Sequence, residues 1–99
     1  MSSEMKLAKQ AVHDKLASQI SMAESKLIAL KARAEATKAQ VEVKAIAELL
    51  ASKPTITRHL DQFKQSADEH WEQAKRELET KVAHFEKTIK AIESKLKAS

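Results

Sequence analysis

The four histidines and the carboxylates of this chain are its first candidates for metal binding or acid–base chemistry, because the sequence contains no cysteine. Helical metal sites often pair a glutamate with a histidine three residues later, and no histidine here follows a glutamate at that spacing. His59 and His70 are 11 residues apart and share a helix phase, but about 16 Å of helix rise separates them. We expect no metal site. We interpret these histidines as a polar helix edge, or alternatively as a pH-sensitive one, since an unperturbed imidazole has a pKa of about 6.5.

Catalytic motifs are also missing. Without glycine, a phosphate-binding loop, a dinucleotide fingerprint or a nucleophile elbow cannot form in its usual way. Asp68, Glu69 and Glu72 form a local acidic cluster, which we interpret as solvated. The sequence therefore predicts a protein that is not an enzyme and uses no cofactor.

The elements that must position these residues are helices. Ala, Lys, Glu, Leu and Gln dominate the 99 residues, and all are good helix formers. No apolar run approaches the roughly 18 to 20 residues that cross a bilayer, and the first ten residues lack the apolar core of a signal peptide. We expect an all-α, cytoplasmic protein.

The net charge of +4 does not favour nucleic acid as a partner, because acidic residues are interleaved with the basic ones. Pairs such as Glu72 with Arg76 and Glu86 with Lys90 have the acid four residues before the base, the favourable order on a helix surface. An unbroken basic stripe and base-stacking aromatics, which nucleic-acid surfaces use, are missing. The charges predict solvated helix faces.

Apolar residues recur with a period of 11 on both sides of the single proline. Downstream, the repeating triplets are Ile56, Leu60, Phe63; Ala67, Trp71, Ala74; and Leu78, Val82, Phe85. Upstream, Leu16, Ile20, Ala23 is followed by Leu27, Leu30, Ala34. An 11-residue period predicts long amphipathic helices with a straight or slightly right-handed course.

Pro54 is predicted to end one helix and start another. It lacks an N–H and restricts Lys53, and the capping residues Ser52 and Thr55 flank it. We expect an antiparallel hairpin of two helices, about 4–51 and 55–97, in one domain spanning 1–99, with its turn at Ser52, Lys53, Pro54 and Thr55. The alternative is a kink in one long helix.

A hairpin with this turn requires facing residues whose numbers sum to about 107. Val43 should then lie beside Phe63, and Trp71 should pack as a core residue opposite Ala36. The segment "SADE", with Ser66 three residues before Glu69, could instead start a third helix as a capping box. The uninterrupted apolar phase from Phe63 to Trp71 favours a continuous helix there.

The first predicted helix carries more apolar surface than one seam can bury. We expect its second stripe to form an oligomer interface that contains Ala39, Val43, Ile46 and Leu50. Two hairpins would then pair as a homodimer and form a four-helix bundle.

Residues 46–75, "IAELLASKPTITRHLDQFKQSADEHWEQAK", resemble the middle of a small family of bacterial and cyanobacterial coiled-coil stress-response proteins. The similar elements are Leu-Asp-x-x-Lys, matched by Leu60, Asp61 and Lys64, and Ser-x-Asp-x-x-Trp-Glu, matched by Ser66, Asp68, Trp71 and Glu72. The chain departs from the pattern by lacking a glycine near that aspartate, by Val82 where a second tryptophan is usual, and by Pro54. The resemblance implies no catalytic or binding residues.

Three functional hypotheses follow. The first is a noncatalytic oligomeric coiled-coil protein with a structural or interaction role, related to stress response if the resemblance holds. The second is an amphipathic-helix protein that binds a lipid membrane or storage granule, like phasins. The third is a helical subunit that docks on a larger complex with an unidentified protein partner. The sequence favours the first.

Overall fold

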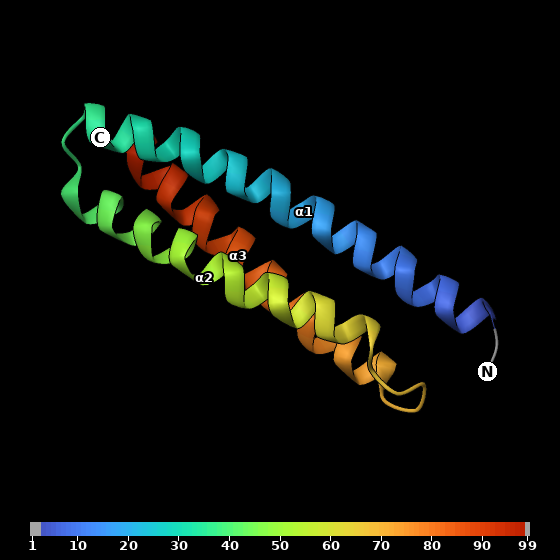
Figure 1. Cartoon of the computed structure of the whole chain (residues 1–99). Helices are drawn as coiled ribbons and strands as arrows, with labels where there is room; N and C mark the ends of the chain where they lie inside the picture. The colour runs from blue at the N-terminus through green and yellow to red at the C-terminus, as the bar shows by residue number, and fades with distance from the viewer. Residues whose placement is uncertain (1–2, 99) are drawn as a thin grey trace.

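The chain forms three α-helices packed side by side in an elongated bundle (Figure 1). The structure is a computed structural model that describes residues 3–98, so the predicted domain ends at 1 and 99 lie outside it. The helices are α1 (Ser3–Ala36), α2 (Gln40–Lys64) and α3 (Trp71–Ala98). α2 runs back along α1, and α3 turns again to run parallel to α1. The bundle measures 54 × 18 × 16 Å, so its length is close to that of one helix.

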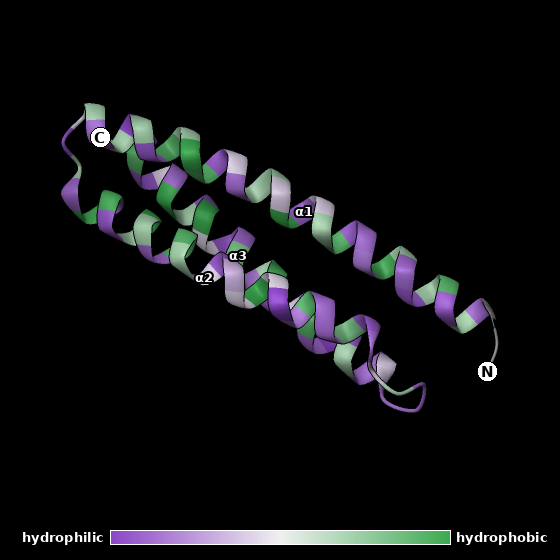
Figure 2. Ribbon diagram, viewed as in Figure 1, coloured by the Kyte–Doolittle hydropathy of each residue, from purple (hydrophilic) through white to green (hydrophobic). Residues whose placement is uncertain are grey.

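One core runs along the bundle axis, where the apolar faces of all three helices meet. Green, hydrophobic residues alternate with purple, hydrophilic ones along each helix in Figure 2, as amphipathic helices require. The buried apolar residues are Leu16, Ile20, Ala23, Leu27, Leu30 and Ala34 in α1, Ile46, Ile56, Leu60 and Phe63 in α2, and Leu78, Val82, Phe85, Ile89, Ile92 and Leu96 in α3.

The period of this core is seven. Buried positions in α1 and α3 alternate in steps of four and three, which is the spacing of heptads. Positions 11 apart also coincide in a heptad pattern, because seven plus four is 11, and this coincidence produced the predicted 11-residue period. Ala67, which that period required in the core, is exposed in the connection between α2 and α3.

The predicted hairpin turn is wrong. Ser52, Lys53, Pro54 and Thr55 all lie inside α2. Pro54 is exposed, and an interior proline costs about 3 kcal/mol. Ile46 before it and Ile56 after it are both buried on one continuous helix face. Burial stabilises by about 1.5 to 3 kcal/mol for each such side chain, so the buried residues on both sides outweigh the proline and the helix continues through it.

The first turn is at residues 37–39, which the sequence reasoning did not foresee. Lys38 has a left-handed backbone (φ 57°). The Ala39 N–H donates to the Ala34 carbonyl at 2.9 Å, and the Lys38 N–H donates to the Glu35 carbonyl at 3.2 Å. These two bonds are those of a Schellman motif, which usually places glycine at the left-handed position. A lysine closes α1 in a chain that has no glycine.

The second turn, residues 65–70, lies at the "SADE" segment, so the interpretation of a continuous helix there is wrong. The Ser66 hydroxyl donates to the Phe63 carbonyl at 2.7 Å, and it therefore closes α2. The His70 carbonyl accepts the first bond of α3 from the Ala74 N–H at 3.1 Å. The apolar phase from Phe63 to Trp71 survives the break because both residues return to the same core.

Three helices in one chain replace the predicted two-helix hairpin and its four-helix dimer. Val43 and Phe63 both belong to α2, and 20 residues of helix rise separate them by about 30 Å. Trp71 begins α3, whereas Ala36 ends α1 at the other end of the bundle (Figure 1). Of the residues predicted for the surplus apolar stripe, Ile46 is buried, and Ala39, Val43 and Leu50 are partly buried against the common core of the three helices.

Candidate functional site: a polar end and an uncharged helix face

Lys9 is buried at a core position of α1 and fixes the turn between α2 and α3. Extending the heptad steps from Leu16 toward the N-terminus places His13 and then Lys9 in line with the core. Lys9 is 8% exposed. Its Nζ donates to the Ser66 carbonyl at 2.6 Å and to Asp68 Oδ1 at 3.0 Å. A buried ammonium needs such partners, so this position joins the start of α1 to the α2–α3 turn.

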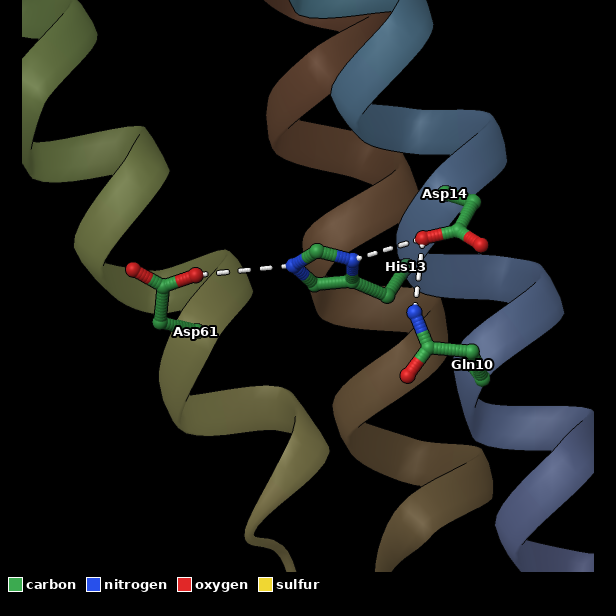
Figure 3. A network of polar contacts seen from close by, with 4 residues as sticks. All are labelled: Gln10, His13, Asp14 and Asp61. Atoms are coloured by element: carbon green, nitrogen blue, oxygen red, sulfur yellow. Dashed lines mark hydrogen bonds and ion pairs between the residues drawn. The ribbon is translucent and has the colours of Figure 1, made fainter.

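His13 lies between two carboxylates one turn further along α1 (Figure 3). Its Nδ1 is 3.2 Å from Asp14 Oδ1, and its Nε2 is 3.4 Å from Asp61 Oδ1 on α2. The Gln10 amide also donates to Asp14 Oδ1, at 2.8 Å. An imidazolium can donate from both ring nitrogens, whereas a neutral ring donates from one. The cluster therefore joins α1 to α2 most fully when His13 carries a proton.

The surroundings of Asp14 favour its charged form. The hydrogen bond from His13, followed by that from Gln10, lowers the pKa of Asp14 below its ordinary value of 3.8. The group is at the surface, so water screens this effect. The arrangement orients a carboxylate and an imidazole at the contact between α1 and α2.

Three further contacts link the helices across their flanks. Lys53 of α2 pairs with Glu24 of α1 at 3.0 Å, and Lys26 of α1 pairs with Glu93 of α3 at 3.1 Å. The hydrogen bond from Lys26 lowers the pKa of Glu93. Lys81 Nζ of α3 lies 3.0 Å from His59 Nδ1 of α2.

The outward side of α1 carries no charge over four turns. We call this surface the α1 outer face; its residues, all exposed, are Ser18, Ser21, Met22, Ser25, Ile28, Ala29 and Ala32. Met22 and Ile28 are 71% and 58% exposed. The charged residues within this span, Glu24, Lys26 and Lys31, lie outside this face, and the first two pair with α2 and α3. Isolated exposed apolar residues are ordinary, but an outward helix face normally includes charged residues, and this face combines serines and alanines with Met22 and Ile28.

An open groove lies beside this face, between α1 and α3. It has a volume of about 560 Å³, and Met22 and Lys26 line it on the α1 side. Glu86, Lys87 and Lys90 line it on the α3 side. Ala83 and Ile89 of α3 also line the groove, so both charged and apolar side chains of α3 lie beside Met22.

The predicted interface residues are used within the chain. Ile46 has 0% exposure and is a central core residue. Ala39, Val43 and Leu50 are partly buried and pack against the same core. Ile46 therefore has no surface to offer a second chain, and the structure does not gather the four residues into one exposed patch.

The other sequence candidates are separated in space. His59 is on α2, whereas His70 is exposed in the turn before α3. Trp71 is partly buried against the core, with Lys75 Nζ 5.9 Å from its ring centroid. Within residues 3–98, no three His, Asp or Glu side chains are placed to hold a metal ion. In the same range, no helix is long and apolar enough to cross a membrane.

Sequence reasoning missed Lys9, His13 and the α1 outer face. The signal for all three was the heptad phase of α1, because it assigns Lys9 and His13 to the core side and Met22 and Ile28 to the outward side. The predicted period of 11 did not separate the core side of α1 from its outward side.

Comparisons with protein-family models, with curated proteins and with solved structures found no match to this chain.

Proposed function

We propose that this chain is a noncatalytic interaction protein that assembles with itself, and that the α1 outer face is the contacting surface. The observation that carries the proposal is the exposure of Met22 and Ile28 on a helix face without charge. The bundle buries its own heptad core, and Met22 and Ile28 stay exposed outside that core on one face of α1.

The energetics favour covering this face. Fully burying a Met or Ile side chain stabilises by about 1.5 to 3 kcal/mol, and a symmetric dimer buries both residues from each chain. Ser21, Ser25 and Ala29 are on the same face as Met22 and Ile28, and small side chains allow two helix backbones to approach closely. No charge has to be removed from water at the centre of such a contact, which avoids the main penalty of helix association.

A structural role also fits the polar end of the molecule. The Lys9 contact fixes the α2–α3 turn, and the His13 contact joins α1 to α2. Both side chains are therefore used to hold the bundle together, whereas a catalytic group needs an open site. A stress-response role is what the family resemblance implies, and the α1 outer face and the polar contacts bear on assembly.

Analytical ultracentrifugation tests the proposal. At tens of micromolar we expect a mass of about twice the 11.1 kDa of one chain, with dissociation on dilution. Ala29→Lys, which puts a charge on the α1 outer face, should give the monomer mass. Ala91→Lys on α3 is the matched control, because Ala91 is also exposed and occupies the equivalent outward heptad position; it should leave the dimer intact.

A monomer mass for the unchanged chain across this concentration range would overturn the proposal. Co-sedimentation of that monomer with anionic phospholipid vesicles, abolished by Ala29→Lys, would then assign the face to lipid. Equal dissociation by Ala29→Lys and Ala91→Lys would show that the contact lies elsewhere on the bundle.

A further inference from the structure

We infer that the partner on the α1 outer face is a second copy of this chain bound in parallel, so that equal residue numbers of the two α1 helices lie at the same height. This inference rests on the proposed self-assembly and adds its orientation and register. The observations that carry it are the exposure of Met22 and Ile28 and the distribution of charge on the two sides of the face.

The outward side of α1 divides into a central line and two flanks. At 100° per residue, positions seven apart stay nearly aligned. The central line is Ala11, Ser18, Ser25 and Ala32. The first flank is Leu7, Asp14, Ser21, Ile28 and Glu35, and the second flank is Ala8, Lys15, Met22, Ala29 and Ala36. The first flank contains acids but no base, and the second contains a base but no acid.

Symmetry decides which flanks meet. Two parallel helices related by a two-fold axis along their length bring the first flank of one chain against the second flank of the other, at equal heights. Two antiparallel helices bring each flank against itself. An antiparallel dimer can therefore never place an acid of these flanks opposite a base, whatever its register.

Parallel pairing matches the flanks in charge and in size. Asp14 faces the partner's Lys15, which pairs opposite charges. Ile28 faces the partner's Ala29, and Ser21 faces the partner's Met22, so a large side chain meets a small one in both layers. The two-fold axis repeats each of these contacts, which makes the surface self-complementary.

Asp14 is suited to this contact. Its hydrogen bonds from His13 and Gln10 both end on Oδ1, and these bonds fix the orientation of the carboxylate (Figure 3). Oδ2 is the atom that would accept from the partner's Lys15 ammonium. The polar end of the bundle thus orients the acid that selects the parallel arrangement.

Cysteine cross-linking tests the register, and the chain suits it because it contains no cysteine. A disulfide requires Cα atoms within roughly 7 Å. In the parallel dimer, Ser18→Cys alone and Ala32→Cys alone should each give a covalent dimer in air. Both outcomes are needed, since an antiparallel dimer centred on Ser18 would cross-link Ser18→Cys but leave the two Ala32→Cys sites about 42 Å apart by helix rise.

An antiparallel dimer centred on Ser25 would give a different pattern. Ser18→Cys and Ala32→Cys would then cross-link when mixed and not when separate. That result, or a dimer mass without any of these cross-links, would overturn the parallel register and leave the proposed self-assembly standing. A monomer mass for the unchanged chain would overturn both.

Charge variants give an independent test. Lys15→Glu should weaken the dimer about tenfold, because it places like charges together twice across the two-fold axis. Exchanging the pair, Asp14→Lys with Lys15→Asp, should restore most of the affinity in a parallel dimer. Failure of the exchange to restore it, with the helical circular dichroism unchanged, would argue against the Asp14–Lys15 contact.

Discussion

At the end of the bundle that contains the α1–α2 turn, the core positions are filled by Leu27, Ile46 and Ala34, and all three have 0% exposure. At the opposite end, the equivalent positions hold Lys9 and His13 on α1. We call the first the apolar end and the second the polar end. Along α1, the same heptad spacing thus supports two kinds of core position, one filled by apolar side chains and the other by charged or polar side chains with hydrogen bonds.

The difference shows how turns of unequal length are held. The short turn at the apolar end is fixed by its own backbone, through the two hydrogen bonds that the N–H groups of Lys38 and Ala39 donate. The longer turn at the polar end is reached by a side chain from another helix, since Lys9 binds both Ser66 and Asp68. A charged core position is costly in desolvation, and at the polar end it fixes a connection that apolar packing alone would leave free to shift.

The largest effect is expected from removing a leucine at each end. Leu27→Ala and Leu16→Ala make the same change, at 0% and 3% exposure, and each should cost about 2 to 5 kcal/mol of unfolding free energy. Leu16 is next to His13 in the heptad pattern, so water can enter the space that Leu16→Ala leaves. The loss of unfolding free energy should therefore be smaller for Leu16→Ala than for Leu27→Ala. Urea denaturation measures both. A larger loss for Leu16→Ala would contradict the contrast between the ends.

Lys9→Ala is expected to be next. This substitution leaves the Ser66 carbonyl and Asp68 without the Lys9 ammonium as a partner, and it should lower the unfolding free energy by about 1 to 3 kcal/mol. Lys26→Ala is the control, because the side chain of Lys26 is 42% exposed and surface pairs are worth about 0 to 1 kcal/mol. Amide hydrogen exchange should also speed up in residues 65–70 with Lys9→Ala alone. Equal losses for the two variants would mean that Lys9 does not fix the turn.

The all-α class of this fold was predictable because the composition is dominated by residues that favour helices. The locations of the turns were not. Pro54 is a strong local signal for a break, yet Ile46 and Ile56 on either side of it share one buried face, and that tertiary burial decided the outcome. The actual turn at Lys38 lacks the glycine or asparagine that normally marks a left-handed position.

Candidate site residues were harder to find, for a related reason. Lys9 and His13 are polar, so a search for apolar periodicity passes over them, and their role depends on Asp68 and Asp61, which are distant in sequence. Met22 and Ile28 were counted with the apolar residues. Knowing that they face outward requires the positions of α2 and α3, which fix the core side of α1.

Lys38→Gly tests the closure of the apolar end. A non-glycine residue in the left-handed region costs about 1 to 2 kcal/mol, and glycine's greater freedom in the unfolded chain offsets part of that gain. We therefore expect stabilisation of up to about 1 kcal/mol, seen as a higher melting temperature. Lys44→Gly, at an exposed position inside α2, should instead destabilise by about 1 kcal/mol. If both variants destabilise, the Schellman turn is not formed by Lys38.

The smallest expected effect is the pH dependence of the carboxylate pairs, one near each end. Asp14 at the polar end and Glu93 toward the apolar end both have a lowered pKa, through hydrogen bonds from His13 and Lys26. A lowered pKa in the folded chain means that the charged group adds stability above its unfolded value, 3.8 for Asp14 and 4.5 for Glu93. That stability is lost as pH falls through the folded pKa. Asp14→Asn and Glu93→Gln should therefore lower the urea midpoint slightly at pH 6. The difference in midpoint from the unchanged chain should disappear as pH falls through the folded pKa of each carboxyl group.

The two variants can be told apart by their partners. Adding His13→Gln should remove the effect of Asp14→Asn, because the imidazole is the main cause of the lowered pKa of Asp14, and it should leave the effect of Glu93→Gln unchanged. A midpoint difference that persists at pH 2 would show that the substituted side chains act through packing. In that case the polar end would owe its contact between α1 and α2 to the shape of His13 and not to the charge of the carboxylates beside it.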